Sequence, residues 1–197
     1  MRTRELAVRG VLEFTPEVFP DARGLFVSPF QLPSFAGATG GPLFQVAQAS
    51  HSVSRRGVVR GIHFTTGTPG TEKYVCCPHG EVLDIVVDLR VGSPTFGTWD
   101  AVVLDQRTFR ALYLPAGVGH AFVSLRDGSV MSYLLSAGYV AEKERAVSVL
   151  DPELALPLPS GIAPVLSERD RLAGTLAEAA ADGILPRYEE TTGSETP

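Results

Sequence analysis

The chain has 197 residues, of which 44% are hydrophobic and 20% are charged, a composition typical of one folded globular domain. Seventeen Lys and Arg residues against 22 Asp and Glu residues leave a formal net charge of -5. This balance gives no reason to expect a nucleic-acid partner or an acidic membrane surface. No run approaches about 18 apolar residues and the first five residues lack an apolar core, so we expect neither a transmembrane span nor a signal peptide.

The only two cysteines, Cys76 and Cys77, are neighbours on a predicted strand. Adjacent side chains of a strand point to opposite faces, so a structural disulfide is not expected. Reduced cysteines favour a reducing compartment, and we expect a cytoplasmic location.

Short strands dominate the first 150 residues. Alternating or β-branched runs predict strands at 10–14, 44–54, 72–77, 81–90, 98–104, 110–114, 120–125 and 129–136. The turn residues 21–24 predict a hairpin that carries Arg23 at its tip or flank, and the glycines and prolines of 31–42 are typical of a loop. So many short strands without a helical period indicate an antiparallel sandwich or barrel.

The pattern changes after Leu150. Prolines at 152, 157, 159 and 164 predict an extended connection over the surface. Thr175 and Glu178 have capping-box spacing, which predicts a short helix over 175–182 that Gly183 ends. We therefore expect one domain over 1–188 and a polar, disordered tail over 189–197.

Residues 57–64 place Arg60 and His63 inside a run that otherwise predicts a buried strand. An unpaired charge in such a place is costly, so a partner is needed. In one interpretation Arg60 pairs with a carboxylate and His63 is a hydrogen-bonded core histidine. In the other, the strand forms the floor of a pocket where Arg60 binds an anion and His63 moves a proton.

The segment Pro115-x-Gly117-x-x-His120 matches the second half-motif of cupins, which are double-stranded β-helix barrels. A metal-binding cupin also carries His-x-His followed by Glu in its first half, and here that position offers His63 alone. A triad of His63, His120 and Glu72 keeps a metal site open as an alternative.

A longer set of motifs resembles one family in register from about residue 5 to 187. The chain is similar to dTDP-4-dehydrorhamnose 3,5-epimerases, above all to the branch that makes dTDP-deoxysugars for glycosylated natural products, where some members invert only C3 or only C5. The resemblance implies a mainly β cupin jelly roll with short C-terminal helices. The matching segments are 19–26, 48–54, 57–64, Lys73, 84–97, 115–120, 151–152 and 167–170.

The resemblance also implies a reaction on a dTDP-4-keto-6-deoxyhexose that requires no metal or redox cofactor. Hydrogens at C3 and C5 are acidified by the C4 ketone, and inversion needs a base on one face and an acid on the other. By resemblance the base is His63, its orienting carboxylate Asp170 and the opposite acid Tyr133. Lys73 favours the enolate, and His120 lines the same pocket.

Each of these assignments has a structural alternative. Asp170 lies three residues after Ser167 and has the spacing to complete a capping box. Tyr133 has the character of a core tyrosine, and Lys73 that of an exposed strand lysine.

The same resemblance assigns the binding of the nucleotide. Arg23 and Arg60 correspond to diphosphate contacts, with help from Gln48, because guanidinium groups suit paired oxygens. Phe26 and Tyr139 correspond to residues that pack against the thymine. Since Arg23 and Phe26 reach the neighbouring chain's site in the family, the resemblance implies a homodimer.

Three positions depart from the family pattern: Ser28 replaces a Glu, Ser50 an Asn and Leu134 a Lys. We expect the loss at Ser28 to affect the thymine contact, and Ser50 and Leu134 to alter polar support around the sugar and the acid. An active enzyme that inverts C3, C5 or both is therefore expected, and the sequence does not identify which carbon is inverted. The rival functions are a metal-dependent cupin enzyme and a non-catalytic nucleotide-sugar-binding cupin.

Overall fold

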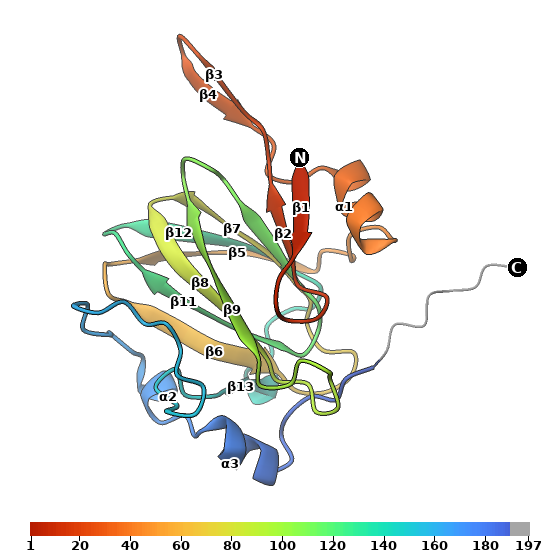
Figure 1. Ribbon diagram of the computed structural model, residues 1–197, viewed down its shortest axis with the longest axis vertical. Helices are drawn as coiled ribbons and strands as arrows, with labels where there is room; N and C mark the ends of the chain where they lie inside the picture. The colour runs from red at the N-terminus through yellow and green to blue at the C-terminus, as the bar shows by residue number, and fades with distance from the viewer. Residues whose placement is uncertain (190–197) are drawn as a thin grey trace, which may run out of the picture.

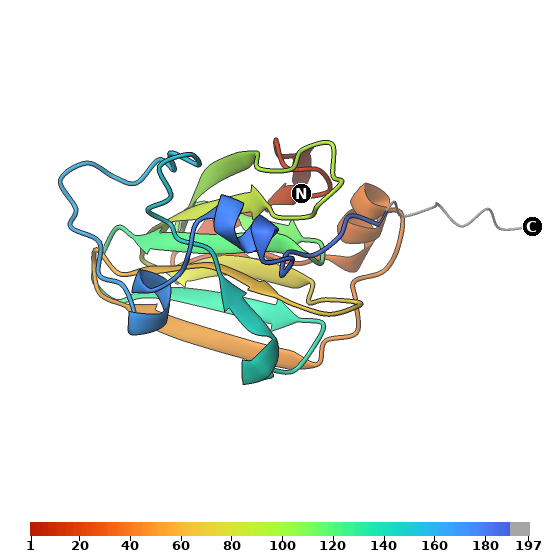
Figure 2. The ribbon, with the colours of Figure 1, turned by 90° about the horizontal axis from the view of Figure 1, so that it is seen from below.

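The computed structural model describes residues 1–189, and its chain forms two antiparallel sheets that lie face to face (Figures 1 and 2). The expected mainly β jelly roll is confirmed. One sheet has six strands in the order β1 (Arg2–Glu5), β2 (Leu12–Thr15), β10 (Ala111–Leu114), β7 (Lys73–His79), β12 (Ser129–Leu135) and β5 (Gln48–Ser54). The other has five in the order β13 (Glu144–Ala146), β6 (Val59–Thr65), β11 (Val118–Ser124), β8 (Glu81–Asp88) and β9 (Trp99–Asp105).

The core fills the space between the two sheets. Val75 and Met131 of the six-stranded sheet join Val86 and Phe122 of the five-stranded sheet in one buried cluster. Because strand side chains alternate, each of these strands turns its other side chains outward, where a second layer covers them.

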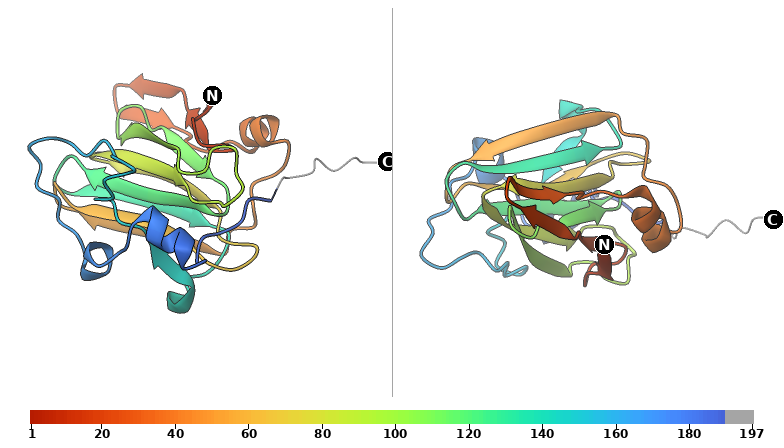
Figure 3. Two further views of the ribbon diagram at one scale, coloured as in Figure 1. Left: turned by 60° about the horizontal axis from the view of Figure 1, so that its bottom comes forward. Right: turned by 90° about the horizontal axis from the view of Figure 1, so that it is seen from above.

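The outer face of the five-stranded sheet is covered by the C-terminal part of the chain, as Figure 3 shows. Ile85 and Leu89 pack there with Leu154 and Ala179. The cover includes α2 (Glu168–Arg171) and α3 (Leu176–Ala181), and the capping box expected at Thr175 is present. The predicted helix over 175–182 is thus confirmed.

The outer face of the six-stranded sheet is covered by α1 (Leu32–Thr39), so the loop predicted over 31–42 is wrong. Phe35 stacks on Phe14 of β2, with ring centroids 5.7 Å apart. A proline in the first turn and Gly40 at the C-cap, with φ of 77°, are compatible with this helix. The strand predicted over 44–54 begins only at Gln48, and a 3-10 turn at Ala141–Lys143 was not anticipated.

A two-stranded hairpin, β3 (Val18–Asp21) and β4 (Gly24–Val27), projects from the body of the protein in Figure 1. It confirms the predicted turn at 21–24. Phe19 and Phe26 are 51% and 67% exposed on this hairpin, so two large aromatic side chains extend away from the core.

The remaining predictions concern the cysteines, the membrane and the tail. Cys76 packs with the cluster beneath α1 and Cys77 with the core between the sheets, which confirms that they face opposite ways, and both are free thiols. Over residues 1–189 the structure contains no helix with the length and apolarity to cross a membrane. The predicted tail at 189–197 lies, apart from its first residue, outside the described residues.

Candidate active site

A β-bulge in β6 brings Arg60 and His63 to the same face. Their spacing of three would place them on opposite faces of a regular strand. Opposite them on β11, however, Phe122 pairs with Arg60 and His120 with His63, so three steps of β6 match two steps of β11. Both side chains therefore line one cavity of about 240 Å³ between the two sheets.

His63 is held by residues that α2 supplies. Nε2 of His63 lies 2.6 Å from Oδ1 of Asp170, and Nη2 of Arg169 lies 2.8 Å from the same nitrogen. The Asp170 backbone N–H donates to Oγ of Ser167. Asp170 thus takes part in the N-cap through its backbone N–H, while its side chain contacts the histidine instead of completing a capping box.

The electrostatics of this pair fit a neutral histidine beside a carboxylate. Burial lowers the pKa of His63, Asp170 opposes the effect, and the charges of Arg169 and Lys73 add to it. Burial disfavours the Asp170 carboxylate, but hydrogen bonds from His63 and Ser167 and the charge of Arg169 outweigh this and lower its pKa. Near pH 7 an uncharged imidazole has a lone pair available to accept a proton.

A second histidine–aspartate pair lies in the same sheet. Nε2 of His120 is 2.8 Å from Oδ2 of Asp84, and both side chains are almost fully buried. The two residues are diagonal neighbours, since His120 pairs with Val86 two positions further along β8. Asp84 lay inside a family motif, but nothing in the sequence pointed to this contact.

Tyr133 enters the cavity from the six-stranded sheet, opposite His63. It pairs with Ser50 of β5, and its hydroxyl lies 3.5 Å from Oγ of Ser52. Burial raises the pKa of Tyr133 well above its usual range, although Ser52 and the charge of Arg60 oppose the effect. The phenol therefore keeps its proton at neutral pH and has it available to donate.

Lys73 begins β7 and lines the cavity instead of facing solvent. Burial lowers the pKa of its ammonium, and the carboxylates of Glu144 and Asp84 oppose this effect. Glu144, which accepts a hydrogen bond from Thr65 at 3.3 Å, also lines the cavity and was not anticipated from the sequence. Arg169 was likewise missed, although it directly precedes Asp170.

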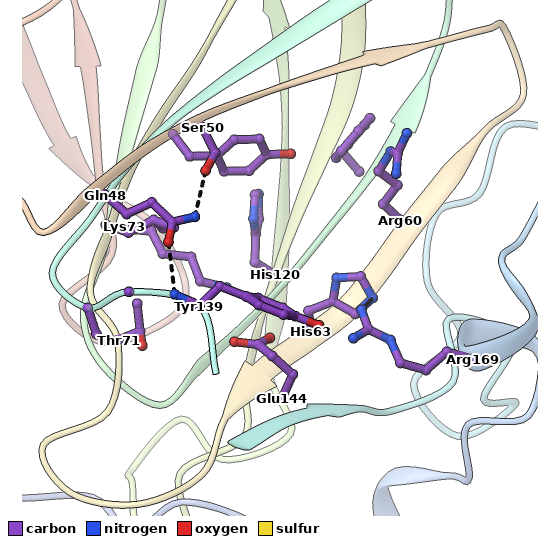
Figure 4. Close-up of a pocket in the computed structure, with 15 residues that line it drawn as sticks. Gln48, Ser50, Arg60, His63, Thr71, Lys73, His120, Tyr139, Glu144 and Arg169 are labelled. Carbon is purple, nitrogen blue, oxygen red and sulfur yellow. Dashed lines mark hydrogen bonds between the residues drawn. The ribbon is translucent and has the colours of Figure 1, made fainter. Parts of the chain in front are cut away.

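The cavity wall opposite His63 and Arg169 is held together through Gln48, as the dashed lines of Figure 4 show. Nε2 of Gln48 donates to Ser50 at 2.8 Å, and its Oε1 accepts from the backbone N–H of Tyr139 at 2.8 Å. Tyr139 lines the cavity and remains 63% exposed. Gln48 therefore fixes the segment that carries Tyr139 against β5.

The two predicted diphosphate arginines lie in different places. Nε of Arg60 donates to Oγ of Ser54 at 3.3 Å, and the side chain lines the cavity, which favours the anion-binding interpretation over a buried ion pair. Arg23 instead lies on the projecting hairpin, where its exposed guanidinium contacts Asp21 at 2.6 Å. Like Phe26, it does not line this chain's own cavity.

The structure differs from the expectations for Leu134 and for the alternative metal site. Leu134 faces the cluster beneath α1, away from Tyr133, so the expected effect of Leu134 on polar support around the acid is wrong. His63, His120 and Glu72 do not form the alternative metal triad. Glu72 accepts a hydrogen bond from Tyr113 and does not line the cavity that contains the two histidines. Among the described residues, no three His, Cys, Asp or Glu side chains are grouped so as to hold a metal ion.

Comparisons with known proteins identify the family of the chain. The family model for dTDP-4-dehydrorhamnose 3,5-epimerase matches residues 5–178. A dTDP-4-dehydrorhamnose 3,5-epimerase from Streptomyces griseus is 49% identical over 95% of this chain and 92% of its own length.

Two solved structures are also similar to this chain. NovW, a 4-keto-6-deoxy sugar epimerase from the novobiocin cluster of Streptomyces spheroides, is 50% identical, with a TM-score of 0.92 over 95% of this chain and 94% of its own. ChmJ, a 3'-monoepimerase from Streptomyces bikiniensis in complex with dTDP-quinovose, is 45% identical. Its TM-score is 0.89, and the match covers 93% of this chain and 92% of the ChmJ chain. The chain therefore belongs to the dTDP-4-dehydrorhamnose 3,5-epimerase family and is an enzyme of the isomerase class.

Proposed function

We propose that the chain epimerises a dTDP-4-keto-6-deoxyhexose at C3, C5 or both, by proton transfer through an enolate between His63 and Tyr133. The observation that carries the proposal is the placement of these two residues on facing sheets, across one cavity. A sugar ring held between them presents one face to the imidazole and the other to the phenol. Inversion requires this arrangement, because the proton leaves one face and returns to the other.

The first step is removal of a proton from the carbon next to the C4 ketone. Neutral His63 takes this proton, and the carboxylate of Asp170, 2.6 Å from Nε2, stabilises the imidazolium that forms. Charge develops on the C4 oxygen, where the Lys73 ammonium and the His120 side chain favour the enolate. These protein groups supply the base and the charge stabilisation, so the proposed route needs no cofactor.

The second step returns a proton from the opposite face. Tyr133 keeps its proton because burial raises its pKa, and it donates that proton to the enolate carbon. The product has inverted configuration, and the phenolate and imidazolium return to their resting forms by exchange with water. Such an epimerase belongs in the biosynthesis of deoxysugars for glycosylated natural products.

Binding of the nucleotide half is proposed to use two chains. Arg60 and Gln48 line the cavity and are suited to the diphosphate, and Tyr139 to the thymine. Arg23 and Phe26 extend from the body on the hairpin β3–β4. Their exposure supports a homodimer in which each hairpin completes the neighbouring site. The two free, neighbouring cysteines support a cytoplasmic location.

The test is proton NMR of dTDP-4-keto-6-deoxyglucose with the enzyme in deuterium oxide. We expect deuterium to replace hydrogen at C3, C5 or both, and the exchanged carbon to be inverted. The position of the label then identifies the regiochemistry. Full retention of both hydrogens and both configurations would contradict the proposal.

A further inference from the structure

The Nε2 atom of His63 has two neighbours of opposite hydrogen-bonding character. Oδ1 of Asp170 lies at 2.6 Å and Nη2 of Arg169 at 2.8 Å. A carboxylate oxygen only accepts hydrogen bonds and a guanidinium nitrogen only donates them. The imidazole nitrogen has one in-plane position, which holds either a proton or a lone pair. Only one of the two contacts is therefore a hydrogen bond at any moment.

The two contacts select opposite tautomers of neutral His63. When Nε2 donates to Asp170, the ring proton is on Nε2 and Nδ1 has a free lone pair. When Nε2 accepts from Arg169, the ring proton is on Nδ1. The ring then has no free nitrogen with which to remove a proton from a substrate.

Arg169 is loosely held at this position. Its side chain is 46% exposed, and its Nε lies 3.8 Å from Oδ1 of Asp170, which is beyond hydrogen-bond distance. Arg169 and Arg60 line the same two adjoining cavities. An anion that binds beside Arg60 therefore offers Arg169 a charge-assisted contact stronger than the one it makes with a neutral imidazole.

We propose that Arg169 is a positioning residue that competes with Asp170 for Nε2 of His63, and that an anionic ligand beside Arg60 withdraws it. The inference rests on the proposed function, in which His63 is the base. Withdrawal lets Nδ1 lose its proton to water while Nε2 gains one from water, so the ring stays neutral. Binding of the diphosphate half of the substrate thus raises the fraction of His63 that is in the base-competent tautomer.

The test is nitrogen-15 NMR of the full chain with labelled histidine, at neutral pH. Chemical shifts and ring couplings report which nitrogen carries the proton, and a His63→Gln variant assigns the signals. Without ligand, we expect a fraction of the His63 rings to carry the proton on Nδ1 and the rest to carry it on Nε2. Saturating dTDP should remove the Nδ1-protonated fraction, whereas thymidine, which lacks the phosphates, should leave it unchanged.

Two variants make the test specific. Arg169→Met should carry the proton on Nε2 with or without dTDP, because the competing donor is gone. Arg171→Met, an exposed arginine of the same short helix, should respond to dTDP like the unaltered chain. Exclusive protonation of Nε2 in the ligand-free unaltered chain would overturn the proposal. Tautomer fractions that are the same before and after saturation with dTDP would also overturn it.

The readout does not depend on turnover, so it separates the two proposals. A dTDP-driven change of tautomer in a chain that exchanges no substrate hydrogen would support the competition at Nε2 and contradict the proposed epimerase mechanism. Normal epimerisation with a tautomer that dTDP does not change would support the proposed epimerase mechanism and contradict the competition at Nε2.

Discussion

At Gly61 the backbone of β6 passes so close to β11 that a Cβ would lie 2.3 Å from the carbonyl oxygen of His120. Its φ of 118° is also strained for any residue with a side chain. This glycine permits the bulge that turns Arg60 and His63 to the same cavity. A shared pocket for both residues was one of the two interpretations of the sequence. Their odd spacing did not explain how they reach one face, because the bulge depends on the neighbouring strand.

We therefore expect Gly61→Ala to lower the free energy of unfolding by about 2 to 5 kcal/mol, from combined backbone strain and overpacking. The control is Gly37→Ala in α1, where nothing lies within 4 Å of the added Cβ; it should be neutral or stabilise by up to about 1 kcal/mol. Denaturant unfolding measures both. Equal stability of the two variants would argue against the close approach at Gly61.

The pH dependence tests the contact between His63 and Asp170. The unprotonated imidazole is the active form, so kcat/KM should fall as pH drops through the pKa of His63. Asp170 opposes the lowering of that pKa by burial. In Asp170→Asn the pKa should fall further, which moves the acidic limb to lower pH, while the plateau drops by about 10²- to 10⁴-fold. An acidic limb that stays in place would show that Asp170 does not act on His63.

At the scale of elements, the strands were predictable because their period of two and their turn residues are local signals. The helix α1 was not, since the prolines and glycines of 31–42 are typical of a loop. The packing that stabilises it is tertiary and includes the cluster of Phe14, Phe35 and Tyr74 on the outer face of the sheet. The same limit applies to the site: Glu144 and Arg169 reach it through the pairing of β13 with β6 and through α2.

The strand β6 is expected to deliver Arg60 to the diphosphate. Arg60→Ala should raise KM by at least about tenfold, because a charge-assisted contact contributes roughly 1.5 to 3 kcal/mol. Arg55→Ala, an exposed arginine just before β6 that does not line the cavity, is the matched control and should leave KM unchanged. Steady-state kinetics measure both, and equal KM values would place the diphosphate elsewhere.

At the scale of the whole molecule, the projecting hairpin β3–β4 has large exposed aromatic side chains that the described part of its own chain does not cover. Its turn was read correctly from the sequence, but a single sequence pattern does not specify what its exposed Phe26 and Arg23 contact. In the proposed dimer, a chain with Arg23→Ala provides an intact His63 to a site, and a chain with His63→Ala provides an intact Arg23 to that same site.

Mixing the two impaired variants should therefore restore activity at substrate concentrations below the KM of Arg23→Ala. After subunit exchange at equal amounts, roughly a quarter of the sites combine an intact His63 with an intact partner Arg23, as expected for a two-fold dimer. Activity assays before and after exchange measure this. If the mixture is no more active than the average of its two components while exchange is verified by mass spectrometry, the hairpin does not complete the neighbouring site.

The most direct measurement of the central claim follows deuterium exchange and inversion separately in two variants. In deuterium oxide, His63→Ala should lose both, because no enolate forms. Tyr133→Phe should still exchange, since His63 can remove the proton and return a deuteron to the same face, while inversion falls by about 10²- to 10⁴-fold. The expected product is labelled substrate with its original configuration. Inversion by Tyr133→Phe at the unaltered rate, or loss of exchange together with inversion in a variant that keeps its melting temperature, would contradict the account.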